Sequence, residues 1–169
     1  MNASLHSLAA RIDTFTDVVG RITAWSTFAL VLVMAGNVLL RYVFSTGSVW
    51  SQELEWHLMV PICLFGMSYA LRHGEHVRVD VVYGGFSQRT KLVVDLISAI
   101  LAIVIAILVI KLSWNYIGQS WRQDEGSANP GGIPYRYVLK ALIPIGFALF
   151  AVQSLAEAAR AIVALRSAR

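Results

Sequence analysis

Long apolar stretches divide this chain into four segments, which are separated by short polar links. The stretches cover about residues 22–40, 54–71, 92–110 and 137–165. A helix needs ~20 mostly apolar residues to cross the hydrocarbon core of a bilayer. The pattern therefore predicts an all-α integral membrane protein, in which four transmembrane helices form a single membrane domain over residues 1–169.

The fourth apolar stretch is longer than a bilayer requires. Its length as a helix is about 43 Å at 1.5 Å per residue, whereas the hydrocarbon core is ~30 Å thick. We expect this helix to tilt or to project beyond the membrane. Glu157 and Arg160, three residues apart on one helix face, mark the expected projecting end.

The segment before the first span, residues 1–21, has a different pattern. Its apolar residues recur every three or four positions, at Leu5, Leu8, Ile12, Phe15, Val19 and Ile22. This spacing predicts an amphipathic helix that lies on the inner leaflet or docks on a partner. Because the first long apolar stretch comes late and no small-x-small cleavage site follows it, a cleavable signal peptide is not expected.

Composition agrees with a membrane location. The chain is 57% hydrophobic and 14% charged, whereas soluble domains carry about 25% charged residues. The net charge of +4 comes from 14 Lys and Arg that flank the apolar stretches instead of forming a basic stripe, which argues against nucleic-acid binding. The single cysteine, Cys63, excludes a disulfide within the chain and reads as a small buried hydrophobe.

The distribution of Lys and Arg predicts the orientation. One side of the membrane receives nine of the 14, and the other receives five. The nine are Arg11, Arg21, Arg72, Arg78, Arg89, Lys91, Arg160, Arg166 and Arg169. Since positive residues concentrate on the cytoplasmic side, both termini are expected in the cytoplasm.

Five polar residues gather near the first outer link. Asn37 and Arg41 lie four apart at the end of the first span, and Glu53, Glu55 and His57 begin the second. We expect Arg41 to pair with Glu53 or Glu55, and Asn37 to form a hydrogen bond across the two helices. Polar groups in membranes are by default functional candidates, so a substrate or ion site is one interpretation. A structural clasp at the interface is the favoured one.

Other polar residues suggest little chemistry. Asp95, near the inner end of the third span, is expected to pair with Arg89 or Lys91 at the interface, with a proton relay as the alternative. His57 is the single histidine within a span, so haem ligation by two histidines is not supported. His73 and His76 lack a third ligand of suitable spacing for a metal. The sequence contains no GxSxG, HExxH, Walker or dinucleotide-binding motif, and we predict a non-enzyme without a cofactor.

Several strings, in their order and spacing, resemble one transporter family. They are NVLLRYVF (Asn37 to Phe44), WSQELEWHL (Trp50 to Leu58), ALRHGEHVRVDVVY (Ala70 to Tyr83) and IPYRYVLKALIPIGF (Ile133 to Phe147). Together they are similar to the small, Q-type (DctQ-like) membrane subunit of tripartite ATP-independent periplasmic (TRAP) transporters, over roughly residues 20–160. Two departures are Ser87, where a proline is expected, and His57.

This resemblance implies a four-helix subunit of the bacterial inner membrane with cytoplasmic termini. Its implied partners are membrane lipid, a large M-type subunit that carries the transport path and sodium sites, and a periplasmic binding protein that delivers an organic acid. The small subunit would brace the large one and help to dock the binding protein. By position, the outer motif matches Asn37, Arg41, Glu53 and Glu55, and the inner-loop motif matches Gly74, His76, Val79 and Asp80.

Two other classes of function stay open at this point. An independent homo-oligomeric transporter or channel would need Asn37, Glu53 or Asp95 to face a shared pore. A membrane anchor subunit of a redox enzyme would need bound haem.

Overall fold

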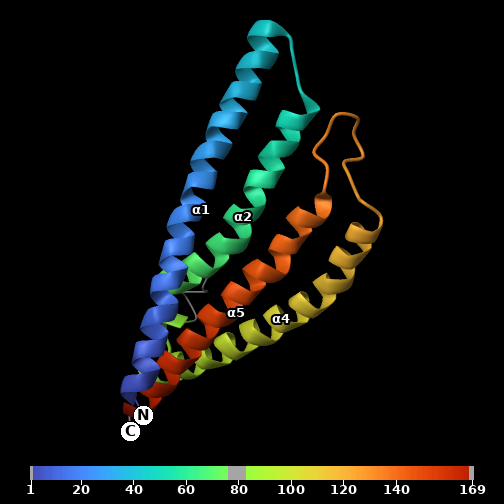
Figure 1. Cartoon of the computed structure of the whole chain (residues 1–169). Coiled ribbons are helices and arrows are strands. Elements are labelled where there is room, and N and C mark those ends of the chain that lie inside the picture. The colour runs from blue at the N-terminus through green and yellow to red at the C-terminus, as the bar shows by residue number, and fades with distance from the viewer. Residues whose placement is uncertain (1, 76–82, 168–169) are drawn as a thin grey trace.

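The computed structural model describes residues 2–75 and 83–167, with side chains from residue 7 onward. Its helices are α1 (Asn2–Phe44), α2 (Val49–His73), α4 (Gln88–Arg122) and α5 (Arg136–Ser167) (Figure 1). All four are long and apolar enough to cross a membrane, and the described residues contain no strand. The all-α, four-span prediction is confirmed, and each predicted span lies inside one helix.

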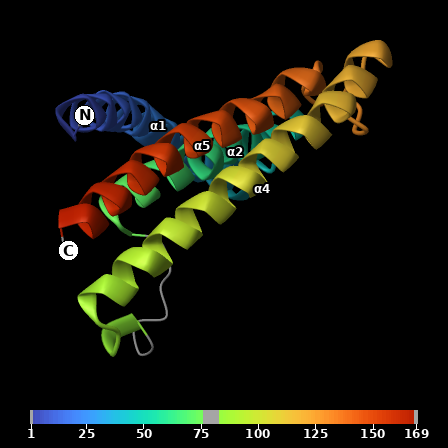
Figure 2. The same cartoon turned by 90° about the horizontal axis from the view of Figure 1, so that it is seen from below.

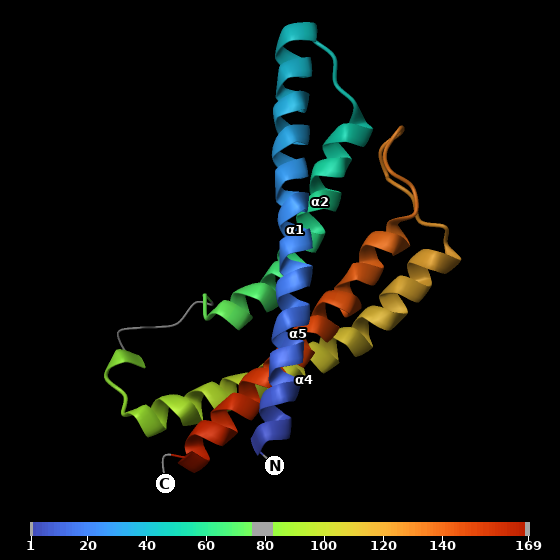
Figure 3. The ribbon, with the colours of Figure 1, turned by 60° about the vertical axis from the view of Figure 1, so that its left-hand side comes forward.

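The helices form two antiparallel hairpins that stand side by side. In Figure 1 the order across the molecule is α1, α2, α5, α4, and α5 lies between α1 and α4 in the view from below in Figure 2. Contacts join α1 to α2, α2 to α5, α4 to α5, and α1 to α5. The hairpins meet at the end that carries both termini, called the inner end here, and diverge toward the opposite, outer end (Figure 3).

The N-terminal segment is helical, as predicted, but it is continuous with the first span. α1 has 43 residues, which makes it about 65 Å long. Near the inner end Ala9 and Thr16 are buried, whereas Leu8 and Phe15 are more than half exposed. The polar and small face of this segment therefore packs on the other helices, and its apolar face points outward.

Small residues make most of the buried apolar contacts. Among the described residues, six of the seven buried apolar side chains are alanines, and the seventh is Leu149. Lipid tails are as apolar as leucine, so the hydrophobic effect does not drive helices together in a bilayer, and close approach through small residues takes its place. Large aliphatic side chains such as Ile105 and Leu108 point outward instead.

One glycine of α5, Gly146, lies close against α2. A Cβ atom on Gly146 would lie 2.7 Å from the Cβ of Leu64 and 3.3 Å from its carbonyl oxygen. Because the Leu64 backbone cannot give way cheaply, a larger residue at position 146 forces the two helices apart. This crossing joins the two hairpins in the middle of the row.

We predict that Gly146→Leu lowers the free energy of unfolding by about 1–3 kcal/mol, the usual cost of overpacking a close contact. Gly36→Leu is the matched control, since a Cβ at Gly36 meets nothing within 4 Å. Both variants gain the same helix propensity. Thermal unfolding in detergent should show a lower midpoint for Gly146→Leu alone; equal midpoints would contradict the predicted role of Gly146.

Candidate functional site

The carboxylate of Glu53, near the start of α2, joins the two hairpins at their outer end. The residue is 1% exposed. It accepts hydrogen bonds from the hydroxyl of Ser127, from the backbone N–H of Ile133 at 2.7 Å, and from the side-chain amide of Asn129 at 3.4 Å. The guanidinium of Arg136 lies 3.6 Å away. A residue of one hairpin thus holds the loop that connects the helices of the other.

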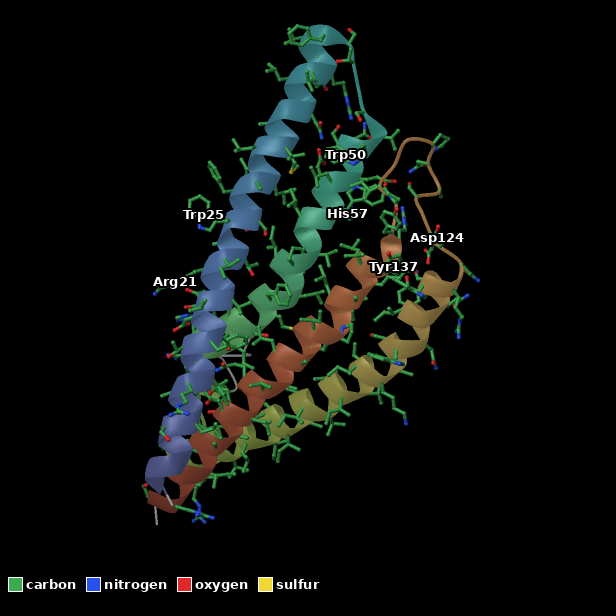
Figure 4. The ribbon with its side chains drawn as sticks, in the orientation of Figure 1. Arg21, Trp25, Trp50, His57, Asp124 and Tyr137 are labelled. Atoms are coloured by element: carbon green, nitrogen blue, oxygen red, sulfur yellow. The ribbon has the colours of Figure 1, made fainter. Side chains whose placement is uncertain are left out.

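This loop, residues 123–135 between α4 and α5, has an unusual backbone. Asp124 and Tyr135 have positive φ angles of 45° and 61°, a region that non-glycine residues adopt at a cost. A Cβ on Gly132 would lie 2.3 Å from the Ser127 hydroxyl oxygen and 2.6 Å from a Glu53 carboxylate oxygen. Figure 4 shows the loop, with Asp124 labelled, beside the part of α2 that carries Trp50 and His57.

A second acidic residue, Glu125, stabilises the base of the same loop. Glu125 forms an ion pair with Lys140 of α5, and the Lys140 ammonium lies 3.9 Å from the ring centroid of Tyr116 in α4. The hydrogen bond from Lys140 lowers the pKa of the Glu125 carboxyl, although partial burial opposes this shift.

The other predicted outer residues have mixed outcomes. The side-chain amide of Asn37 donates to Glu55 at 2.6 Å and joins α1 to α2, as the sequence predicted. The pairing of Arg41 with Glu53 or Glu55 is wrong, because within the described chain Arg41 forms no ion pair. Residues two apart on a helix do not share a face, so Glu55 turns toward α1 and Glu53 toward the loop. Arg41 lines a small pocket of about 150 Å³ beside Asn37.

His57 bonds within its own helix. Its Nδ1 lies 2.7 Å from the carbonyl oxygen of Glu53, and since a carbonyl only accepts, Nδ1 is the protonated nitrogen. Over the described residues, no group of three His, Cys, Asp or Glu is arranged to hold a metal ion.

A second polar cluster joins three helices at the inner end, around Asp13 of α1. Its carboxylate lies 3.2 Å from the Nε of Arg72 in α2 and 2.8 Å from the Nη1 of Arg160 in α5. It also accepts a hydrogen bond of 3.0 Å from Gln153, which in turn accepts one of 2.9 Å from Thr16. Gln153 and Thr16 are fully buried.

Two further polar contacts, one of them an ion pair, extend this inner cluster. His73 Nε2 lies 3.1 Å from Asp17, and Arg160 also pairs with Glu157. The sequence marked Glu157 and Arg160 as a projecting helix end but missed Asp13 and Gln153. Asp13 belongs to the polar face of residues 1–21, opposite the apolar face. This polar face could have predicted the contact, but it was not assigned a partner.

Asp95, near the inner end of α4, also has a partner that was not predicted. The hydroxyl of Tyr83 donates to both carboxylate oxygens, at 2.9 and 3.0 Å. No ion pair joins Asp95 to Arg89 or Lys91 among the described residues, so the expected pairing is wrong. The Lys91 ammonium lies 5.5 Å from the Tyr83 ring centroid instead.

The inner-loop motif is only partly described. Gly74 ends α2 with a φ of 73°, and its N–H reaches the carbonyls of the last helical turn, which explains a glycine at this position. His76, Val79 and Asp80 lie outside the described residues.

Four membrane-length helices, tied to one another by polar clusters near both ends, define a multi-pass helical membrane protein. The sequence matches the family of tripartite ATP-independent periplasmic transporters, DctQ component, over residues 30–164. The chain belongs to this family of small TRAP transporter subunits, and its role is that of a transporter subunit.

Three relatives have related names. The chain is 24% identical over 161 residues to the C4-dicarboxylate TRAP transporter small permease protein DctQ of Vibrio cholerae, covering 83% of this chain and 69% of the relative. It is 23% identical over 159 residues to the ectoine TRAP transporter small permease protein TeaB of Halomonas elongata, covering 91% and 79%. A shorter match, 29% over 81 residues, links it to the sialic acid TRAP transporter small permease protein SiaQ of Vibrio cholerae, covering 48% and 44%.

We predict that Asp13→Asn lowers the free energy of unfolding by about 2 kcal/mol, in the range for hydrogen bonds to charged groups, because two arginines lose a shared counter-ion. Asp17→Asn is the matched control. Asp17 lies on the same face of α1 but is more exposed, 28% against 13%, so its loss should cost less than about 1 kcal/mol. Thermal unfolding in detergent measures both, and a larger effect of Asp17→Asn would refute the central role of Asp13.

The Glu125–Lys140 pair predicts a pH dependence. Since the pKa of Glu125 is lowered in the folded chain, its contribution is complete above the ordinary glutamate pKa of about 4.3 and is lost as the pH falls through the lowered value. The unfolding midpoint of Glu125→Gln should therefore lie below that of the unmodified chain at pH 7, and the two should converge in acid. A constant difference across this range would exclude the ion pair as its cause.

Proposed function

We propose that this chain is a non-catalytic small permease subunit that braces the large membrane subunit of a TRAP transporter in the bacterial inner membrane. It would also help to dock the periplasmic binding protein during sodium-coupled uptake of an organic acid. Family membership supports the role as a transporter subunit. The relatives' names, with C4-dicarboxylate, ectoine and sialic acid, suggest that the solute is small and polar.

The bracing role rests on one observation. Polar contacts join the two helix hairpins near both ends, while the large apolar side chains face outward. Glu53 joins the hairpins at the outer end and Asp13 at the inner end. The long aliphatic side chains of α4 and the aromatic side chains of α1 are exposed, as Figure 4 shows for Trp25. Four helices that keep a fixed arrangement and expose an apolar surface are suited to pack on the large subunit and to widen the part of the transporter that is held in the bilayer.

The polar residues that an independent channel would need are used within the subunit. Asn37 bonds to Glu55, Glu53 to the outer loop, and Asp95 to Tyr83. A shared pore in a homo-oligomer would require these groups to turn toward a common axis. Their present bonds therefore favour a supporting subunit over an autonomous transporter.

The proposed orientation follows from the Lys and Arg count and places both termini in the cytoplasm. The inner end of the structure is then cytoplasmic, and the loop of residues 123–135 faces the periplasm. Arg11 and Arg21, both exposed on α1, would lie near the inner headgroups.

Co-purification tests this proposal. Co-expressed with the large membrane subunit of its transporter, the tagged chain should elute with that subunit in mild detergent, because the packed interface survives extraction. In liposomes the chain alone should show no uptake of C4-dicarboxylates, ectoine or sialic acid. A chain that elutes alone, or that transports by itself, would contradict the proposed role.

A further inference from the structure

We infer that Glu53 is a positioning residue, which holds the loop of residues 123–135 in the shape that receives the periplasmic binding protein. The inference rests on the proposed function and adds the surface that takes part in docking and the side chain that shapes it.

The groups around Glu53 are complementary to a carboxylate and to little else. The hydroxyl of Ser127, the amide of Asn129, the N–H of Ile133 and the guanidinium of Arg136 all reach it as hydrogen-bond donors or as a positive charge. An ionised carboxylate only accepts and has about four acceptor positions. The neutral amide of glutamine would turn an NH₂ group toward donors and leave at least one of them unpaired.

A buried carboxylate is a poor choice if the two hairpins need only to adhere. Apolar residues of similar volume often stabilise a packed site as well as a buried charge does, and the charge instead favours one particular arrangement. Here that arrangement is the path of the loop, because three of the four partners, Ser127, Asn129 and Ile133, lie within it. Glu53 comes from the other hairpin, so it fixes the loop against a second body.

The loop backbone is held under strain at both of its ends. Asp124 and Tyr135 have positive φ angles without being glycine, and such residues persist where the surroundings over-determine them. The N–H of Arg136 donates to the carbonyl of Glu125 at 2.9 Å and closes the base of the loop. The hydrogen bonds to Glu53 and the bond between Arg136 and Glu125 together hold the loop in this shape.

The loop and the adjoining end of α4 expose charged and aromatic side chains that suit a soluble partner. Asp124 and Tyr135 of the loop are exposed, and so are Trp121 and Arg122, the last two residues of α4. Aromatic residues and arginine are enriched in protein–protein interfaces, and a loop ordered before binding loses less entropy in the complex. In the proposed orientation this surface faces the periplasm, where the binding protein is found.

The test compares Glu53→Gln with Glu55→Gln in the complex with the large subunit, reconstituted in lipid nanodiscs. Glu55 is the matched control, because it lies on the same helix but bonds to Asn37 of α1. The probe is the periplasmic binding protein of the same transporter. We expect Glu53→Gln to weaken its equilibrium binding at least tenfold and Glu55→Gln to change it less than twofold, while both variants keep the large subunit.

A second readout follows the loop itself. A spin label on Ala128→Cys, which is exposed within the loop, is introduced in a Cys63→Ala background. Its spectrum should report faster motion in Glu53→Gln than in Glu55→Gln. Glu53→Asp, which keeps the charge on a shorter side chain, should fall between the unmodified chain and Glu53→Gln in both measurements.

Gly132→Ala disturbs the same contact from the loop side and serves if Glu53→Gln does not assemble. Its Cβ would meet the Ser127 hydroxyl and the Glu53 carboxylate, so it should also weaken binding while α2 is unchanged. A mobilised loop with unchanged affinity, or an immobile loop in Glu53→Gln, would overturn the inference but leave the bracing role intact. If the unmodified complex does not bind the binding protein, the proposed docking function itself fails.

Discussion

The arrangement of α1, α2 and α5 depends on a contact between charges at the inner end, where Arg72 and Arg160 meet on the carboxylate of Asp13. In a bilayer, apolar faces gain little by leaving lipid for one another. Helices that are apolar all round have no preferred angle unless polar groups or small residues select one. Asp13 selects it by bringing one point on each of α1, α2 and α5 together. The outward direction of the apolar face of α1 follows from this choice.

At the outer end, too, polar groups select the arrangement of the hairpins, but the contact there involves a loop. There the helices diverge, and the joint is made by a loop that folds back onto Glu53. The backbone N–H and short side chains of the loop reach the Glu53 carboxylate across a distance at which the side chains of two straight helices would not meet. Charge pairs between helix sides suit the closed end, and a loop held by one carboxylate suits the open one.

The sequence predicted what depends on length and composition, and it missed what depends on rotation. Four spans follow from apolar runs, and these are insensitive to which face of a helix turns inward. The hydrogen bond between Asn37 and Glu55 was predicted because a short link brings their helix ends together. The pairing of Arg41 failed because Glu53 faces away from α1, and the link length does not report on helix rotation.

The inner cluster was missed for a related reason. The pattern of residues 1–21 shows an apolar face, which was expected to meet the inner leaflet or a partner and which does point away from the other helices. No partner was assigned to the opposite face, where Asp13 and Thr16 turn inward. Asp95 shows a further limit, since charge alone suggested Arg89 or Lys91, whereas the actual partner is the neutral hydroxyl of Tyr83.

The buried small residues of α4, Ala99, Ala106, Ser113 and Ser120, recur every seven positions. A seven-residue repeat corresponds to 3.5 residues per turn, so the seam against α5 winds as a left-handed supercoil. Inserting a single residue in α4 would rotate everything beyond it by about 100° and bring a branched aliphatic side chain into the seam. Insertions or deletions of seven would keep the register. The length of this hairpin can therefore change during evolution in steps of two turns, so bilayers of different thickness can be matched without a new helix interface.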